Sequence, residues 1–352
     1  MDSSEFRRQT PSWCVVLILL LSAASLKAQQ GAEPATTLIN RHAVVYCAVT
    51  GKVYAVDKTH NAVWIIGPSG EAKSVKVGAG PEAIAANTVT GIAYVASSTA
   101  ANVSVLDGKT DAVVATVATA ARPYAIAVDV LANKVYVSNT FSSMLTVIDG
   151  ATDKVTNVKT GSADAIVIDA EAGKVYLLGY ETDALTMLDT SSGALSKVPA
   201  GAMHLWGLAL NRAAGKLYVT HVNDGSLGVI DLKTQHETTV PAGAIPSAVA
   251  VNAADGRVYV TNYGSGTVTV IGPDDRVDTI VKVGNHPQAV AVDRRRNLIA
   301  VANTADNTLS LIDGKTQRVW KTMPAGEHPY AIAINEETQR IYVANLGKNP
   351  GE

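Results

Sequence analysis

One unit of short apolar segments recurs through this chain at an almost constant interval. Its clearest copy spans residues 257–272, where residues 258–260 and 268–271 alternate in the manner of strands around a glycine-rich turn at 262–266. We expect Asn262 to close the first of these strands by bonding the turn backbone through its short amide side chain. The unit therefore predicts antiparallel strands joined by tight turns.

A third apolar segment precedes each copy of the unit. These segments begin at residues 41, 81, 123, 163, 205, 246, 287 and 329, so the spacing is always 40 to 42 residues. Five begin with proline, and the other three begin with Arg41, Ala163 and Leu205. A period near 40 with four short strands in each unit is the signature of a β-propeller blade, and we letter its strands A to D in chain order.

The sequence thus predicts an all-β fold, a β-propeller of four-stranded blades. Eight A segments favour eight blades, with a seven-bladed ring as the alternative, in which the end strands overlap the first blade. The last unit stops after its A and B strands. We expect residues 35–39 to supply its outer strand, so that the two chain ends close the ring and leave no exposed sheet edge.

The turn-preceding motif carries a family resemblance. It reads Tyr259-Val260-Thr261-Asn262 in the clearest copy and Tyr136-Val137-Ser138-Asn139 in an earlier one. This motif resembles the YVTN repeat of a family of bacterial, often exported β-propellers (YncE-like), and the resemblance covers residues 41–345. It implies a propeller fold and leaves the activity open, because propellers host unrelated functions.

The first 28 residues have the pattern of a signal peptide. Arg7 and Arg8 precede an apolar run at 14–21 that is too short to span a bilayer comfortably, and Ala28 suits a cleavage site. An uncleaved anchor is the alternative. We expect residues 29–40 to form a tether or closing strand, and residues 41–352 a single propeller domain. The protein would then be periplasmic or secreted, without a membrane anchor after cleavage, and a monomer.

Common catalytic and nucleotide-binding motifs are absent from the sequence: it has no HExxH, CxxC, phosphate loop or GxSxG elbow. A formal net charge of −2 provides no bulk attraction to nucleic acid. We interpret the one basic run, at residues 294–296, as a solvated turn. Cys47 is the only cysteine after the signal segment, and we expect it to be buried and inert.

Alternating strand direction places the D-to-A and B-to-C loops together on one side of the ring, which we call the D-to-A face. Six of the seven histidines fall on it, and His236 falls on the opposite face. The predicted ligand-binding residues are Arg122, Tyr124, His204, Trp206, His286, Gln288, His328 and Tyr330, with Tyr180 and Tyr263 further out. A competing interpretation is that loop positions beside proline merely tolerate such residues.

Two functions follow as hypotheses. The first is an exported, non-catalytic binding or scaffolding propeller that uses the D-to-A face for a protein or small-molecule ligand. The alternative is a propeller hydrolase or lyase, by analogy with propeller lactonases, with a metal at the channel mouth. His286, His328 and His42 would hold zinc or copper there, unless each ring simply bonds a neighbouring loop. The acidic residues on this face are Glu82, Asp164 and Glu327.

Overall fold

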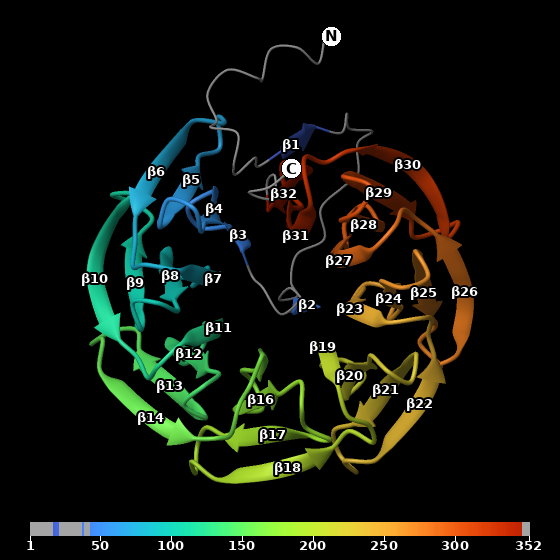
Figure 1. Ribbon diagram of the computed structural model, residues 1–352, viewed down its shortest axis with the longest axis horizontal. Helices are drawn as coiled ribbons and strands as arrows, with labels where there is room; N and C mark the ends of the chain where they lie inside the picture. The colour runs from blue at the N-terminus through green and yellow to red at the C-terminus, as the bar shows by residue number, and fades with distance from the viewer. Residues whose placement is uncertain (1–16, 21–36, 39–42, 347–352) are drawn as a thin grey trace.

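The computed structural model describes residues 17–20, 37–38 and 43–346 of the chain, and every regular element in these residues is a β-strand. Seven antiparallel sheets that each contain four strands of the repeat, one of them with a short fifth strand, and one three-stranded partial sheet stand side by side around a common axis (Figure 1). The A strands are innermost and the D strands form the outer wall. This arrangement is that of a seven- or eight-bladed propeller.

The sheets follow one another in chain order. Sheet 1 contains β3 (Val44–Cys47), β4 (Lys52–Asp57), β5 (Ala62–Ile66) and β6 (Ala72–Lys76), and sheet 2 contains β7 (Pro81–Ala86), β8 (Ile92–Ser97), β9 (Asn102–Asp107) and β10 (Ala112–Ala118). Sheet 3 contains β11 (Pro123–Asp129), β12 (Lys134–Asn139), β13 (Met144–Asp149) and β14 (Val155–Lys159), and sheet 4 contains β15 (Ala165–Asp169), β16 (Lys174–Leu178), β17 (Ala184–Asp189) and β18 (Leu195–Pro199).

The second half of the ring repeats this pattern. Sheet 5 contains β19 (Leu205–Asn211), β20 (Lys216–His221), β21 (Ser226–Asp231) and β22 (Glu237–Pro241), and sheet 6 contains β23 (Pro246–Val251), β24 (Val258–Asn262), β25 (Thr267–Ile271) and β26 (Val277–Lys282). Sheet 7 contains β27 (Pro287–Asp293), β28 (Leu298–Asn303), β29 (Thr308–Asp313) and β30 (Arg318–Pro324). The partial sheet contains β31 (Pro329–Asn335), β32 (Arg340–Asn345) and β1 (Leu17–Leu20).

The partial sheet contacts the sheets on both sides of it. Ala331 belongs to the same buried cluster as Ala43 of the first repeat, and Ile341 to the same cluster as Ala289 of sheet 7. The outer neighbour of β32 is β1, with Leu17 opposite Val343. The carboxy-terminal strands therefore lie between the first and the seventh sheet.

The expectation that residues 35–39 would pair with the last unit is wrong for the described part of that segment. The strand β2 (Thr37–Leu38) pairs instead with β19 in sheet 5, with Leu38 opposite Leu208. It lies inside the ring (Figure 1). An A strand bonds its own B strand on one edge only, so its channel-side edge is free to accept an extended segment. Sequence periodicity cannot reveal this pairing, because β2 lies outside the repeats.

The tyrosine that opens most copies of the motif links neighbouring sheets. Tyr218 and Tyr259 are 1% and 0% exposed. Tyr218 of sheet 5 packs with Val249 of sheet 6, and Tyr259 of sheet 6 packs with Val290 of sheet 7. Burial of so large a ring is worth about 1.5–3 kcal/mol, so the motif holds the ring together blade by blade.

The loops divide between the two faces as the strand directions require. Backbone N–H groups of Val222 and Thr304 in B-to-C loops donate to the carbonyls of His204 and His286 in D-to-A loops, at 3.1 and 3.0 Å. These bonds tie both kinds of loop together on the D-to-A face.

Among the described residues, no helix is long and apolar enough to cross a membrane.

Charged side chains join neighbouring sheets on the opposite face. Lys52 pairs with Asp111 at 2.7 Å, and Arg294 pairs with Glu336 at 3.0 Å. Arg296 bonds Asp293 at 2.6 Å. The basic run at 294–296 forms a turn, as expected, and Arg295 is exposed, but Arg294 and Arg296 are partly buried in ion pairs with carboxylates. Cys47 is buried, as predicted.

Candidate functional site

Two backbone features repeat at the mouth of the ring, and together they set the direction of the side chains there. The residue before most A strands has a left-handed backbone: Arg122, His204, Ile245, His286 and His328 have φ between 51° and 61°. Its carbonyl accepts a hydrogen bond from the B-to-C loop of its own sheet. Histidine is among the residues that tolerate this conformation. Arginine and isoleucine occupy it too, so the fold fixes the backbone and leaves the side chain variable.

The second feature is a β-bulge at the start of the A strand. Register shifts follow the first residue of six A strands: β7, β11, β19, β23, β27 and β31. The bulged position carries Glu82, Tyr124, Trp206, Ser247, Gln288 and Tyr330. Bulges change the direction of side chains and are common beside binding sites. All six of these side chains thus sit on a β-bulge at the start of an A strand.

Three aromatic rings contact one another between sheets 4 and 5. The ring of Tyr180, in a B-to-C loop, meets the ring of Trp206 at a centroid distance of 5.4 Å and an interplanar angle of 88°. It also meets the ring of His204 at 5.1 Å and 61°. All three side chains are partly exposed. We call Tyr180, His204 and Trp206 the aromatic cluster.

The aromatic cluster borders a carboxylate and a shallow hollow. The backbone N–H of Tyr180 donates to Oδ2 of Asp164 at 2.8 Å. Burial raises the pKa of Asp164 above its usual value, and the nearby charge of Glu181 raises it further, against the effect of that hydrogen bond. On the other side, Asn223 bonds Nδ1 of His204 at 2.7 Å and lines a hollow of about 380 Å³ together with Asp224 and residues 243–245.

The other predicted ligand-binding residues lie in separate groups around the mouth. The guanidinium of Arg122 lies over the ring of Phe141 at 4.5 Å, and Tyr124 is partly buried in the core beside sheet 4. The ring of His286 stacks on Tyr263 at 4.3 Å and 10°. The structure therefore brings His204 and Trp206 together and gives Arg122 and His286 other partners.

Gln288 and Tyr330 serve the packing between sheets. The hydroxyl of Thr304 donates to the carbonyl of Pro329 at 2.7 Å, and the side-chain amide of Gln288 lies 3.1 Å from the same hydroxyl. Tyr330 is only 4% exposed and belongs to the cluster that joins the partial sheet to sheet 1. Its ring therefore fills the junction between the partial sheet and sheet 1, and its role in ligand binding stays a prediction.

The metal hypothesis involves one residue outside the described part of the chain, His42. Within the described residues, no three histidine, cysteine, aspartate or glutamate side chains gather as a metal would require. The backbone N–H of His328 donates a hydrogen bond to Oδ1 of Asn307 at 2.7 Å. The proposed set of His286, His328 and His42 stays a prediction.

His221 was expected on the D-to-A face, but its side chain is 1% exposed. It replaces the asparagine of the motif and contacts Glu237 at 3.1 Å and Ser226 at 3.1 Å. Gly228 makes room for this pair, since a Cβ there would lie 2.7 Å from the imidazole. His221 is therefore a core residue of sheet 5 rather than a mouth residue.

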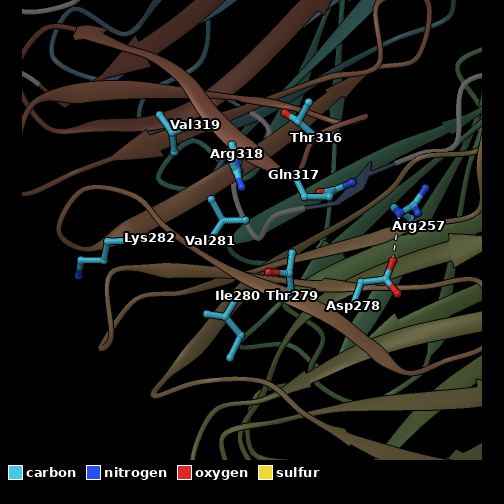
Figure 2. A pocket seen from close by; sticks show the side chains of 10 residues that line it. All are labelled: Arg257, Asp278, Thr279, Ile280, Val281, Lys282, Thr316, Gln317, Arg318 and Val319. Atoms are coloured by element: carbon cyan, nitrogen blue, oxygen red, sulfur yellow. Dashed lines mark hydrogen bonds and ion pairs between the residues drawn. The ribbon is translucent and has the colours of Figure 1, made fainter.

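A second, larger groove lies away from the mouth, between the outer strands β26 and β30 (Figure 2). Its volume is about 680 Å³, and its walls include Arg257, Lys282 and Arg318. Arg257 donates to Asp278 at 3.0 Å, so these two charges satisfy each other. The groove is open and lacks the aromatic side chains that gather at the mouth, and we consider the mouth the stronger candidate.

Comparison with known proteins supports the β-propeller fold and identifies no family. No protein-family model matches the sequence, and no curated protein sequence matches it. Hydrazine synthase from Kuenenia stuttgartiensis has a similar structure, with a TM-score of 0.64 and 15% identity over 82% of this chain and 99% of that one. The dihydro-heme d1 dehydrogenase NirN, solved in complex with DHE, has a TM-score of 0.70 and 14% identity over 92% of this chain and 71% of that one. At such identities the structural similarity shows the β-propeller fold alone.

Proposed function

We propose that this protein is an exported YVTN-type β-propeller that binds a ligand at its D-to-A face without transforming it. The aromatic cluster is the observation that carries the proposal. Partly exposed Tyr180 and Trp206 meet at the mouth, and aromatic side chains with one wet side are typical of recognition surfaces.

The fold itself does not require these side chains. The bulged position holds serine in sheet 6, where the A–B register shift has the same size as in sheet 5. A tryptophan at this position in sheet 5, matched by Tyr180 from the neighbouring sheet, thus goes beyond what the repeat needs. By contrast, many charged groups of the opposite face are used in ion pairs between sheets, such as Lys52 with Asp111. These differences support the D-to-A face as the functional one.

The proposal includes eight blades and export. Eight A strands, with β31 packed between sheets 7 and 1, support an eight-bladed ring. Arg7, Arg8 and the apolar run that follows support export. The proposed function, ligand binding outside the cytoplasm, agrees with an eight-bladed ring and with export.

Native mass spectrometry after incubation with a periplasmic small-molecule extract tests the proposal. We expect the purified protein to retain a bound mass, and we expect Tyr180→Ala and Trp206→Ala to lose it while keeping their circular dichroism spectra. The matched control is Arg295→Ala, because Arg295 is an exposed residue of the opposite face. This variant should retain the bound mass. No bound mass, or equal retention by all variants, would contradict the proposal.

A further inference from the structure

We propose that the mouth between sheets 4 and 5 binds an organic ammonium ion, with Tyr180 and Trp206 as aromatic walls and Asp164 as the counter-ion. This inference rests on the proposed function and specifies the class of ligand. Its evidence is the geometry of the rings, the unpaired negative charge beside them, and the contrast with the equivalent position in sheet 2.

The rings form two walls of a corner. Tyr180 and Trp206 stand at 88° to each other with centroids 5.4 Å apart, and His204 adds a third ring 5.1 Å from Tyr180. The electron-rich face of an aromatic ring attracts a cation held within about 6 Å of its centroid, and tryptophan and tyrosine do so best. Tyr180 and Trp206 meet edge to face, so their contact covers at most one of the four ring faces, and the remaining faces point in two perpendicular directions.

The charge beside this corner is negative and lacks a basic partner. Asp164 accepts the N–H of Tyr180 through Oδ2, and Glu181 follows in the next position of the loop and is exposed. Within the described residues, neither carboxylate forms an ion pair with lysine or arginine, as the pairs found there show. A partly buried carboxylate without a counter-ion is costly, and a bound cation removes that cost.

Sheet 2 provides the contrast. Glu82 follows the first residue of its A segment, as Asp164 does in sheet 4, and it forms an ion pair with Lys58 of sheet 1. The chain thus neutralises one mouth carboxylate internally and leaves the other for an external cation. Negative potential favours a cationic ligand over a neutral or anionic one at Asp164.

The rings favour an organic cation over a metal ion. A transition metal requires several nitrogen, sulfur or oxygen ligands around it, and within the described residues no such group of three gathers. A methylated ammonium instead spreads its charge over an apolar surface that aromatic walls can cover. The side-chain amide of Asn223 holds the ring of His204 in place through Nδ1, at 2.7 Å.

Calorimetric titration with choline, and with its neutral isostere 3,3-dimethylbutan-1-ol, tests the inference on the purified protein. We expect choline to bind and the isostere to bind at least about tenfold more weakly. We expect Asp164→Asn to weaken choline binding at least about tenfold, a change of about 1.4 kcal/mol. Glu82→Gln, the matched control in sheet 2, should leave choline binding unchanged.

Ring variants separate the walls from a general loss of structure. Tyr180→Phe keeps the ring and should retain choline binding, whereas Tyr180→Leu and Trp206→Leu should lose it, and the indole N–H resonance of Trp206 should shift on titration. The inference is overturned if choline and tetramethylammonium fail to bind at millimolar concentration, if the isostere binds equally, or if Asp164→Asn binds as well as the wild type. If a ligand from extract still binds through Trp206 in any of these cases, the ammonium inference fails and the proposed function stands.

Discussion

The hydroxyl of Thr220 accepts a hydrogen bond from the backbone N–H of Gly207 at 2.6 Å, one residue beyond Trp206. The same bond joins Ser138 to Ala125 at 3.0 Å. In these sheets the A–B register resumes three residues after the start of the A strand, at Leu208 and Ile126. Where the motif has alanine at this position, as at Ala302, the register resumes after two residues. The third residue of the motif thus sets the size of the bulge that carries the mouth side chain.

Removing this hydroxyl tests its role in stability. Thr220→Val keeps the shape but leaves the N–H of Gly207 and the carbonyl of Ser247 without the bonds they now make. We expect a loss of about 1–3 kcal/mol in the free energy of unfolding, measured with urea, because a buried donor becomes unsatisfied. Thr239→Val at an exposed position of the same sheet should change stability by less than about 0.5 kcal/mol. Equal stability of Thr220→Val and wild type would contradict this account.

The raised pKa of Asp164 predicts a pH-dependent effect on stability. Burial penalises the ionised form in the folded state, so its contribution is most favourable below the ordinary pKa of aspartate, about 3.9, and is lost as pH rises through the higher folded-state value. We expect Asp164→Asn to melt at a higher temperature than wild type at pH 7, with the gain disappearing as the pH falls toward 3.5. A variant that melts lower at pH 7, or whose difference from wild type does not change with pH, would refute the prediction.

Closure of the ring can be tested by truncation. Deleting residues 327–352 removes β31 and β32, which contact the sheets on both sides. We expect a sharp fall in the melting temperature, because two neighbours lose their packing surface at once. Self-association on gel filtration should accompany it, because the deletion exposes new core surface. A monomeric truncated protein with an unchanged melting temperature would argue against closure by these strands.

Metal binding by the histidines is tested by calorimetry with zinc and copper. If the channel-mouth metal site exists, the double variant His286→Ala and His328→Ala should abolish binding. His236→Ala, on the opposite face, should leave binding intact. Absence of binding by the wild type at micromolar concentration, or equal binding by the double variant, would remove the metal proposal.

The fold could be predicted because its cause is local and repeated. The spacing of the A segments predicted four-stranded blades, and seven sheets with four strands of the repeat confirm it. The role of Asn262 was harder to predict. Its amide bonds the hydroxyls of Thr267 and Thr269 in the next strand rather than the turn backbone. The alternation of strands identifies which residues are neighbours in the sheet, but it does not identify which hydroxyl an amide selects.

The site could be predicted only in part, because its contacts cross between sheets. Strand direction placed His204, Trp206 and Tyr180 on one face. The meeting of Tyr180 with Trp206 depends on the angle between sheets 4 and 5, which no repeat encodes. His221 was misplaced because Glu237, from a strand further along, draws it into the core. Phe141 and Asn223 were missed, although both lie in B-to-C loops shortly after the motif.

Hydrogen exchange measured with and without the ligand-containing extract fraction tests the central claim most directly, because it locates binding even when the ligand is unidentified. The account predicts slower exchange at residues 179–183, 204–207 and 222–225, which surround the aromatic cluster and the adjoining hollow. Protection confined to the outer strands β26 and β30, or to the turns of the opposite face, would contradict it.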